Sequence, residues 1–357
     1  MKKKLLLIIS AVIVTLVALL ILFYNIGLSA VSSDSSEVEF VIEEGSTYYS
    51  VINKLKSENL IKNELCFKIY IKLNNKNRLE AGTYLIRKNM SVKEIVEVLD
   101  KGNTYNPDVI NITFKEGKNM RWIASTIASN TNNTEEDVYN LLNDKTYLNE
   151  LINEYWFIDL SILNRNIYYA LEGYLFPNTY EYMNKDVTVK EIFKSMLDEM
   201  NLKLNAYKED IENNNYSVHE LLTLASIVEL EGRANSDRAG IAGVFYNRLN
   251  SGWTLGSDVT TYYAAKVDMS ERDLYVNEIN DRNYYNTRSD FLAGKLPIGP
   301  ISNPGIDSIK AVLYPTNSDY YYFVADKNGK TYFTYTYPEH LAKRDELIEA
   351  GLWYTYE

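Results

Sequence analysis

The sequence predicts an α+β protein with an N-terminal transmembrane helix, a small strand–helix module after it, and a larger mixed α/β domain. Three observations predict this arrangement. An uncharged apolar run fills residues 5–28, short strand and helix patterns alternate over 37–102, and a capped, apolar helix begins at Ser217 in the remaining part. A length of 357 residues suits two or three domains and is ample for a hydrophobic core.

The N-terminus predicts a membrane anchor. Residues 1–4, with three lysines, precede the 24 uncharged residues of 5–28. A bilayer core of about 30 Å needs roughly 20 apolar helical residues, so this run is long enough to span it. Because lysines stay on the cytoplasmic side, we expect a single-pass protein of the cell membrane with a cytoplasmic tail and an extracytoplasmic main part. A signal peptide cleaved near Gly27-Leu28-Ser29 is the alternative, although signal h-regions run only about 7–15 residues.

The next segments predict small strand–turn–helix units. Residues 29–36 are small and polar and form a linker, and the module over 37–102 follows. Within this module, Ser91 and Glu94 have the spacing of a helix capping box. Units of this kind are similar to LysM-like modules, which grip glycan. We expect strands at 38–42 and 82–86, helices at 49–55, 65–73 and 90–99, and a weak repeat of the first strand, turn and helix at 110–128.

The rest of the chain, residues 103–357, is predicted to form one domain with its core at about 168–345. Residues 134–164 have a polar, helical pattern, which we interpret as a solvated connector. A final helix is expected over about 340–350.

Composition excludes several kinds of site. The chain has 37 Lys and Arg against 48 Asp and Glu, a net charge of −11, which argues against a nucleic-acid partner. A single cysteine, Cys66, excludes an internal disulfide and a cysteine-rich zinc module. His219 and His340 stand far apart and no HExxH motif occurs, so neither a metal site nor another cofactor is expected.

One glutamate interrupts the apolar helix that begins at Ser217. Glu229 shares a helix face with Ala225 and Ser226, whose small side chains would leave a hollow in front of the carboxyl group. Apolar surroundings disfavour a charged carboxylate, so such a group can keep a proton near neutral pH and donate it. Spacing alone instead favours an ion pair with Arg233, four residues further along the helix.

A series of motifs runs from about residue 37 to the C-terminus. They include Leu171-Glu172-Gly173-Tyr174-Leu175-Phe176-Pro177, Leu224-Ala225-Ser226-Ile227-Val228-Glu229, Val244-Phe245-Tyr246-Asn247-Arg248-Leu249, Ser257-Asp258-Val259-Thr260, Tyr285-Asn286-Thr287 and Leu296-Pro297-Ile298-Gly299-Pro300. In order and spacing they resemble the endolytic murein transglycosylases of the MltG (YceG-like) family. Val259 and Ile298 replace prolines usual in that family.

The resemblance implies that residues 103–357 are a YceG-like catalytic domain and that Glu229 is its catalytic glutamate. The implied activity is non-hydrolytic cleavage of the MurNAc–GlcNAc bond of nascent peptidoglycan strands. It leaves 1,6-anhydroMurNAc ends and terminates glycan elongation. The implied partners are peptidoglycan strands, the membrane and penicillin-binding synthases.

Four polar residues are candidate substrate contacts, each with a structural alternative. Asn286 and Thr287 either hold the N-acetyl group and sugar hydroxyls or form an Asn-centred turn. Asp258 and Glu172 are either second carboxylates or anchors of loops.

Two further candidates are Tyr174, which either stacks on a sugar or packs in the core, and Arg238. Arg238 either binds peptide or lactyl carboxylates or forms a surface ion pair. The alternative function is a non-catalytic peptidoglycan-binding scaffold of the cell-wall synthesis machinery, and a hydrolase is a third possibility.

Overall fold

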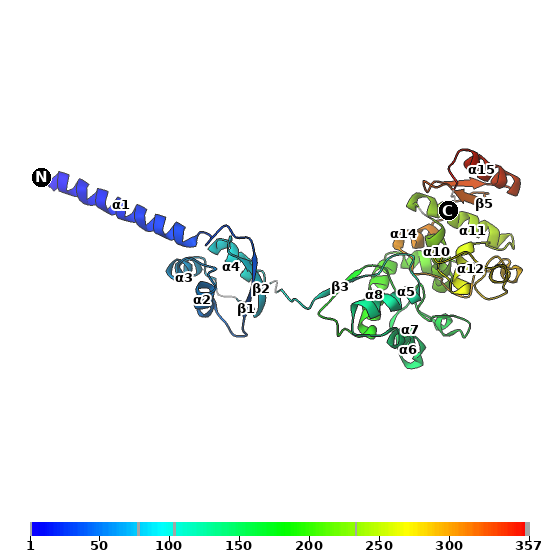
Figure 1. Ribbon diagram of the computed structural model, residues 1–357, viewed down its shortest axis with the longest axis horizontal. Coiled ribbons are helices and arrows are strands. Elements are labelled where there is room, and N and C mark those ends of the chain that lie inside the picture. Colours follow the sequence, from blue (N-terminus) through cyan, green and yellow to red (C-terminus); the bar gives the residue numbers. More distant parts are fainter. Residues whose placement is uncertain (1, 77–78, 103–104, 233, 354–357) are drawn as a thin grey trace. The chain divides into compact units, whose positions relative to one another are not determined.

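The computed structural model describes residues 2–76, 79–102, 105–232 and 234–353, and the chain divides into two compact units (Figure 1). The first comprises residues 1–107 and the second residues 108–357. In the described residues the strands form three two-stranded antiparallel sheets among many helices. The predicted mixture of α and β structure is therefore confirmed.

The first unit begins with α1 (Lys2–Leu28), which confirms the helix predicted for residues 5–28. By length and composition its segment Lys3–Leu28 qualifies as a membrane-spanning helix, and none of its most apolar window is buried. Large side chains such as Leu7 and Leu20 are exposed, which water penalises and a bilayer core does not. These properties are consistent with the predicted single-pass anchor.

A small sheet and three helices complete the first unit. Phe40 and Tyr84 face each other across the sheet and are fully buried against Ile52 and Ile95 of the helices. The capping box that Ser91 forms with its helix is confirmed. The elements are β1 (Glu37–Ile42), α2 (Tyr48–Ser57), α3 (Glu64–Leu73), β2 (Gly82–Arg87) and α4 (Val92–Asp100).

The second unit opens with β3 (Ile110–Thr113), which pairs with the distant β4 (Thr179–Tyr182). A turn at Gly117 leads from β3 into α5, as the repeat in the sequence predicts. The helices between and after these strands are α5 (Met120–Asn130), α6 (Glu135–Asn143), α7 (Lys145–Glu154), η1 (Leu160–Leu163), α8 (Val189–Asn205) and α9 (Lys208–Glu212).

The prediction of a solvated connector at 134–164 is wrong. Val138 and Leu142 of α6 and Leu148 and Leu151 of α7 are buried in the main hydrophobic core. These apolar residues recur at helical spacing on one face of each helix, and the acidic and amide residues on the other face concealed that pattern.

The centre of the second unit is a helical layer made of α10 (Val218–Glu231), α11 (Asn235–Asn250) and α14 (Ile306–Leu313), which pack on one another. The capping box of Ser217 and Glu220 is confirmed, and every residue from Leu221 to Val228 is buried. Beside this layer lie α12 (Asp258–Ala265), α13 (Val276–Ile279) and η2 (Asp290–Leu292).

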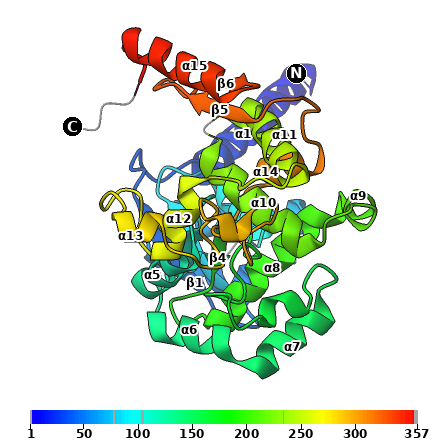
Figure 2. The same cartoon turned by 90° about the vertical axis from the view of Figure 1, so that its right-hand side faces the viewer.

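The chain ends in a hairpin and a helix that lie together beside α11, at the opposite end of this unit from α6 and α7 (Figure 2). The hairpin consists of β5 (Tyr322–Ala325) and β6 (Thr331–Thr334), and α15 (Tyr337–Glu349) follows it. Gly243 on α11 has no room for a Cβ, which would collide with the carbonyl oxygen of Thr316.

Candidate active site

Glu229 lies in the last turn of α10, where three helices of the central layer meet. Its side chain is 5% exposed, and each carboxylate oxygen accepts hydrogen bonds. Arg238 of α11 donates through Nη2 to Oε1 at 2.7 Å. Gly305 N and Ser308 Oγ, at the start of α14, donate to Oε2 at 3.0 and 2.8 Å. Glu229 is therefore surrounded by donors from two other helices.

The prediction that Glu229 has apolar surroundings is wrong. Ser226 leaves no hollow, because its hydroxyl donates to Thr223 O at 2.7 Å and accepts from Ile301 N at 3.0 Å. The Glu229 carboxylate points instead at a cation and at the positive end of the α14 dipole, both of which attract negative charge. Arg233, the ion-pair partner favoured by spacing, lies outside the described residues.

Arg238 is the partner that Glu229 has in the structure, nine residues further along the chain. Gly232 is the C-cap of α10 and lies so close to Arg238 that a Cβ would stand 2.6 Å from Arg238 Cγ. The glycine thus lets the arginine side chain fold back over the helix end. The Arg238 side chain is 7% exposed, and its Nη1 is buried without a hydrogen-bond partner among the residues that the structure describes.

A second glutamate faces this ion pair from the turn between β3 and α5. Glu116 is more exposed than Glu229, yet its carboxyl group lies so close to Gly305 that a Cβ there would collide with it. Burial, and after it the charge of Glu229, raises the pKa of Glu116, while the Arg238 cation lowers it. Sequence reasoning missed Glu116, and its only signal was the repeated Glu-Gly turn at 44–45 and 116–117.

A pocket of about 300 Å³ adjoins this cluster. Gly117 forms part of its wall, and a Cβ on Gly117 would lie 3.5 Å from Glu229 Cγ. Trp122, Asn119 and Tyr262 supply aromatic and polar side chains to the same wall. The lining of the pocket includes Leu230, the chain neighbour of Glu229, but neither glutamate, and two larger hollows of about 650 and 670 Å³ do not include the glutamates either. Gly117 and Leu230 place the small pocket next to Glu229.

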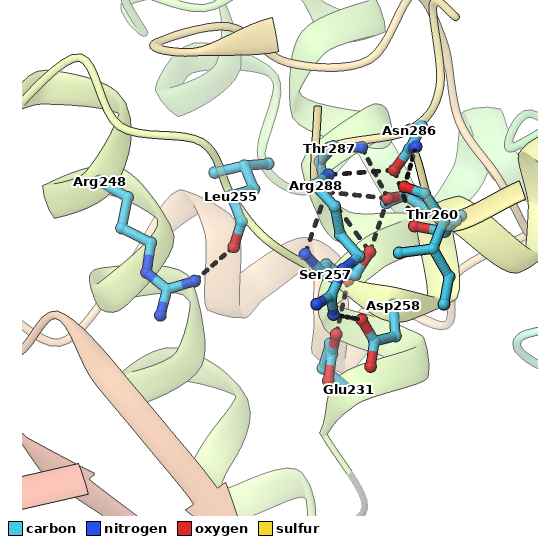
Figure 3. Close-up of polar contacts among 11 residues, drawn as sticks. Glu231, Arg248, Leu255, Ser257, Asp258, Thr260, Asn286, Thr287 and Arg288 are labelled. Atoms are coloured by element: carbon cyan, nitrogen blue, oxygen red, sulfur yellow. Dashed lines mark hydrogen bonds and ion pairs between the residues drawn. The ribbon is translucent and has the colours of Figure 1, made fainter. Parts of the chain in front are cut away.

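Asn286 and Thr287 lie in a polar network with Thr260 and Thr261 of α12 (Figure 3), where neither side chain is exposed. Asn286 Nδ2 donates to the carbonyl oxygens of residues 279 and 281 at 3.0 and 2.7 Å, and its Oδ1 accepts from Thr261 Oγ1 at 2.8 Å. Thr287 Oγ1 accepts from Ser257 N at 3.1 Å. This placement matches the turn alternative, because both side chains hold loops together.

Asp258 is on the surface, where it forms an ion pair with Arg288 (Figure 3). The neighbouring Glu231 is the last residue of α10 and accepts from Ser257 Oγ at 2.5 Å. Burial raises the pKa of Glu231. Ser257 thus ties the end of α10 to the loop before α12.

Glu172 and Tyr174 are core residues in the structure. Glu172 is 1% exposed and accepts from Met120 N, Tyr263 Oη and Asn303 Nδ2 at 2.9, 3.0 and 3.0 Å. Burial raises the pKa of Glu172 to about 7. The Tyr174 hydroxyl shares a hydrogen bond of 2.8 Å with His219 Nδ1. Both residues have the placement of internal anchors.

The sequence and the structure of this chain are similar to those of several known proteins. The sequence matches the model of the YceG-like family over residues 40–346. It is 36% identical over 325 residues to a Bacillus subtilis protein named endolytic murein transglycosylase, covering 90% of this chain and 88% of that protein. A protein of the same name from Streptococcus pneumoniae D39 is 33% identical over 327 residues, and the match covers 87% of this chain but only 58% of that longer relative. A 2.6 Å crystal structure of a yceG-like protein from Listeria monocytogenes has 33% identity and a TM-score of 0.61, covering 87% of this chain and 99% of that one.

Proposed function

The chain belongs to the YceG-like family and is a peptidoglycan lytic transglycosylase, and we propose that Glu229 is its catalytic acid and base. The observation that carries the assignment is the position of Glu229 at the meeting point of three helices, behind the wall of a pocket. The proposed substrate is the nascent glycan strand, cleaved between MurNAc and GlcNAc without water.

The proposed reaction uses one carboxyl group twice. Protonated Glu229 donates to the oxygen that joins the two sugars, and the bond from MurNAc C1 to that oxygen breaks. The resulting Glu229 carboxylate takes the proton of the MurNAc C6 hydroxyl, whose oxygen bonds to C1 and closes a 1,6-anhydro ring. Glu229 ends protonated as it began, so the second carboxylate that glycoside hydrolases use to activate water or attack the sugar is not required.

The donors around Glu229 support the first half of this cycle. Arg238, Gly305 N and Ser308 Oγ all stabilise the carboxylate that forms as the proton leaves. The second half needs the same carboxylate as a base, correctly oriented towards the C6 hydroxyl. Three fixed donors restrict the rotation of the carboxyl group and so provide that orientation.

The pocket beside Gly117 is the proposed position of the sugar next to the cleaved bond. The indole of Trp122 offers an apolar face on which a sugar ring can stack, and Asn119 offers a polar group that can bind sugar hydroxyls. Glu172, Tyr174, Asn286 and Thr287 support the site by holding its loops.

The rest of the chain suggests where the enzyme works. We propose that α1 anchors it with the N-terminus in the cytoplasm, and that the strand–helix unit of residues 37–102 is a LysM-like glycan-binding module. An extracytoplasmic enzyme held at the membrane meets strands as they are made. Cutting them there terminates elongation, which makes penicillin-binding synthases the proposed partners.

Digestion of nascent, uncrosslinked strands by the detergent-solubilised chain tests this proposal. Mass spectrometry should find anhydro ends with the wild type, each one water lighter than a reducing end, and no cleavage with Glu229→Gln. Reducing ends would identify a hydrolase, and intact strands would favour the non-catalytic scaffold. Activity retained by Glu229→Gln would refute the assignment of the acid.

A further inference from the structure

The chain contains two strand–turn–helix segments with the same Glu-Gly turn, and the two turns differ in what packs against them. Glu44-Gly45 follows β1 and Glu116-Gly117 follows β3, and both glycines have positive φ, of 79° and 71°. A Cβ on Gly45 would meet no atom within 4 Å, so the first turn is open. A Cβ on Gly117 would lie 3.3 Å from Leu230 and 3.5 Å from Glu229, so the second turn packs against the end of α10.

This packing brings Glu116 next to Gly305, the residue whose N–H binds the Glu229 carboxylate. The Glu116 carboxyl group contacts Gly305, whose N–H donates to Glu229 Oε2 at 3.0 Å. Among the described residues, the charged groups that act on Glu116 are Glu229 from α10, Arg238 from α11 and Asp307 from the first turn of α14. Three carboxyl groups, Glu116 included, therefore lie around one arginine.

Arg238 has a donor that Glu229 does not use. Its Nη2 donates to Glu229, whereas Nη1 is buried and has no hydrogen-bond partner in the described part of the chain. An open donor of this kind is costly to keep buried. When Glu229 takes up the proton that the reaction requires, Arg238 also loses its counter-charge, which is strongly unfavourable in a buried site.

We propose that Glu116 is a positioning residue for cleavage, because its ionised carboxylate becomes the counter-ion of Arg238, through Nη1, whenever Glu229 is protonated. The negative charge of Glu116 then favours the protonated form of Glu229 that the reaction requires, and Arg238 turns from Glu229 to Glu116 when Glu229 is protonated. This inference rests on the proposed role of Glu229. Like charges held close together behave in this way, since both cannot ionise freely.

The test is the pH dependence of strand cleavage by the full chain in detergent. Glu116→Gln removes the charge that favours protonated Glu229, so the alkaline limb of the kcat profile should move about one pH unit towards acid. At neutral pH kcat should fall about tenfold, with KM within about twofold of the wild type. Glu116→Asp, which keeps the charge, should return the limb towards its original position.

Glu44→Gln is the matched control, because it makes the same change in the same turn sequence of the other unit. Its profile should overlay that of the wild type. A Glu116→Gln profile with an unmoved limb, whether or not kcat changes, would overturn the inference and leave the role of Glu229 intact. Inactive wild type, or active Glu229→Gln, would instead mean that the proposed function fails.

A second measurement reads the coupling directly. Carboxyl ¹³C shifts of Glu116, followed through a pH titration, should show a midpoint that moves to lower pH in Glu229→Gln, because the neighbouring charge is gone. An unchanged midpoint would show that the two carboxyl groups do not interact.

Discussion

Arg238 Nη2 lies 2.7 Å from Glu229 Oε1, and both side chains are at least nine-tenths buried. The pair joins the last turn of α10 to α11, and it sets the charge that the reacting group faces. An ion pair in such surroundings is costly to break from one side, because the remaining charge stays buried without compensation.

A double-mutant cycle should reveal this coupling. Arg238→Gln and Glu229→Gln should each destabilise the second unit by about 3 kcal/mol, and the double variant by clearly less than their sum. Tryptophan fluorescence in a urea titration reports the transition, since all four tryptophans lie in residues 108–357. The exposed pair Lys190–Glu150 is the control and should couple by less than about 1 kcal/mol. Additive effects at Arg238 and Glu229 would contradict the buried pair.

Ser308→Ala should slow cleavage without weakening substrate binding. It removes one of two donors to Glu229 Oε2, so the carboxylate formed during the reaction loses about 1–2 kcal/mol of stabilisation. We expect kcat to fall about five- to thirtyfold at constant KM. Ser195→Ala, which removes an exposed hydroxyl on α8, should leave the kinetics unchanged. A rise in KM alone would place Ser308 in binding.

Gly305→Ala should disturb the site through one contact. Its φ of −76° suits alanine, but the new Cβ would collide with the Glu116 carboxyl group. That group is the far end of a flexible, exposed side chain, so Glu116 can swing aside and we expect the unfolding free energy to fall by no more than about 0.5 kcal/mol. Glu116→Ala removes the obstacle altogether, so Gly305→Ala should be neutral in that background. A clear loss in both backgrounds would show that the collision lies elsewhere.

Glu172 should make stability depend on pH. Its pKa is raised from 4.5 to about 7, so the native state binds a proton that the unfolded chain releases. Stability therefore falls as pH rises from about 4.5 to about 7, and the full benefit of the bound proton is present only below that window.

Glu172→Gln should remove this dependence of the unfolding free energy on pH. Relative to the wild type, the variant should gain on the order of 3 kcal/mol between pH 4.5 and pH 8, measured by urea unfolding at each pH. Glu181→Gln, at an exposed position of β4, should show no such gain. A constant difference between Glu172→Gln and wild type across this range would contradict the raised pKa.

Local patterns in the chain were sufficient for much of the architecture. The apolar run of α1, the capping boxes at Ser91 and Ser217, and the buried character of α10 are confirmed, because each depends on neighbours within a few residues. The motif ending in Glu229 also indicated the family. The prediction of a solvated connector at 134–164 was wrong, because α6 and α7 each have a narrow apolar face that their polar outer faces concealed.

The surroundings of Glu229 were decided only by the tertiary fold. Its donors Gly305 and Ser308 lie 76 and 79 residues away along the chain, and Glu116 reaches the site from a separate strand and turn. Spacing on one helix suggested an apolar hollow, since helical periodicity reports which residues share a face but not what packs against it. Coulomb and hydrogen-bond energies depend on distances in space, and those distances were set when α10, α11, α14 and the turn after β3 packed together.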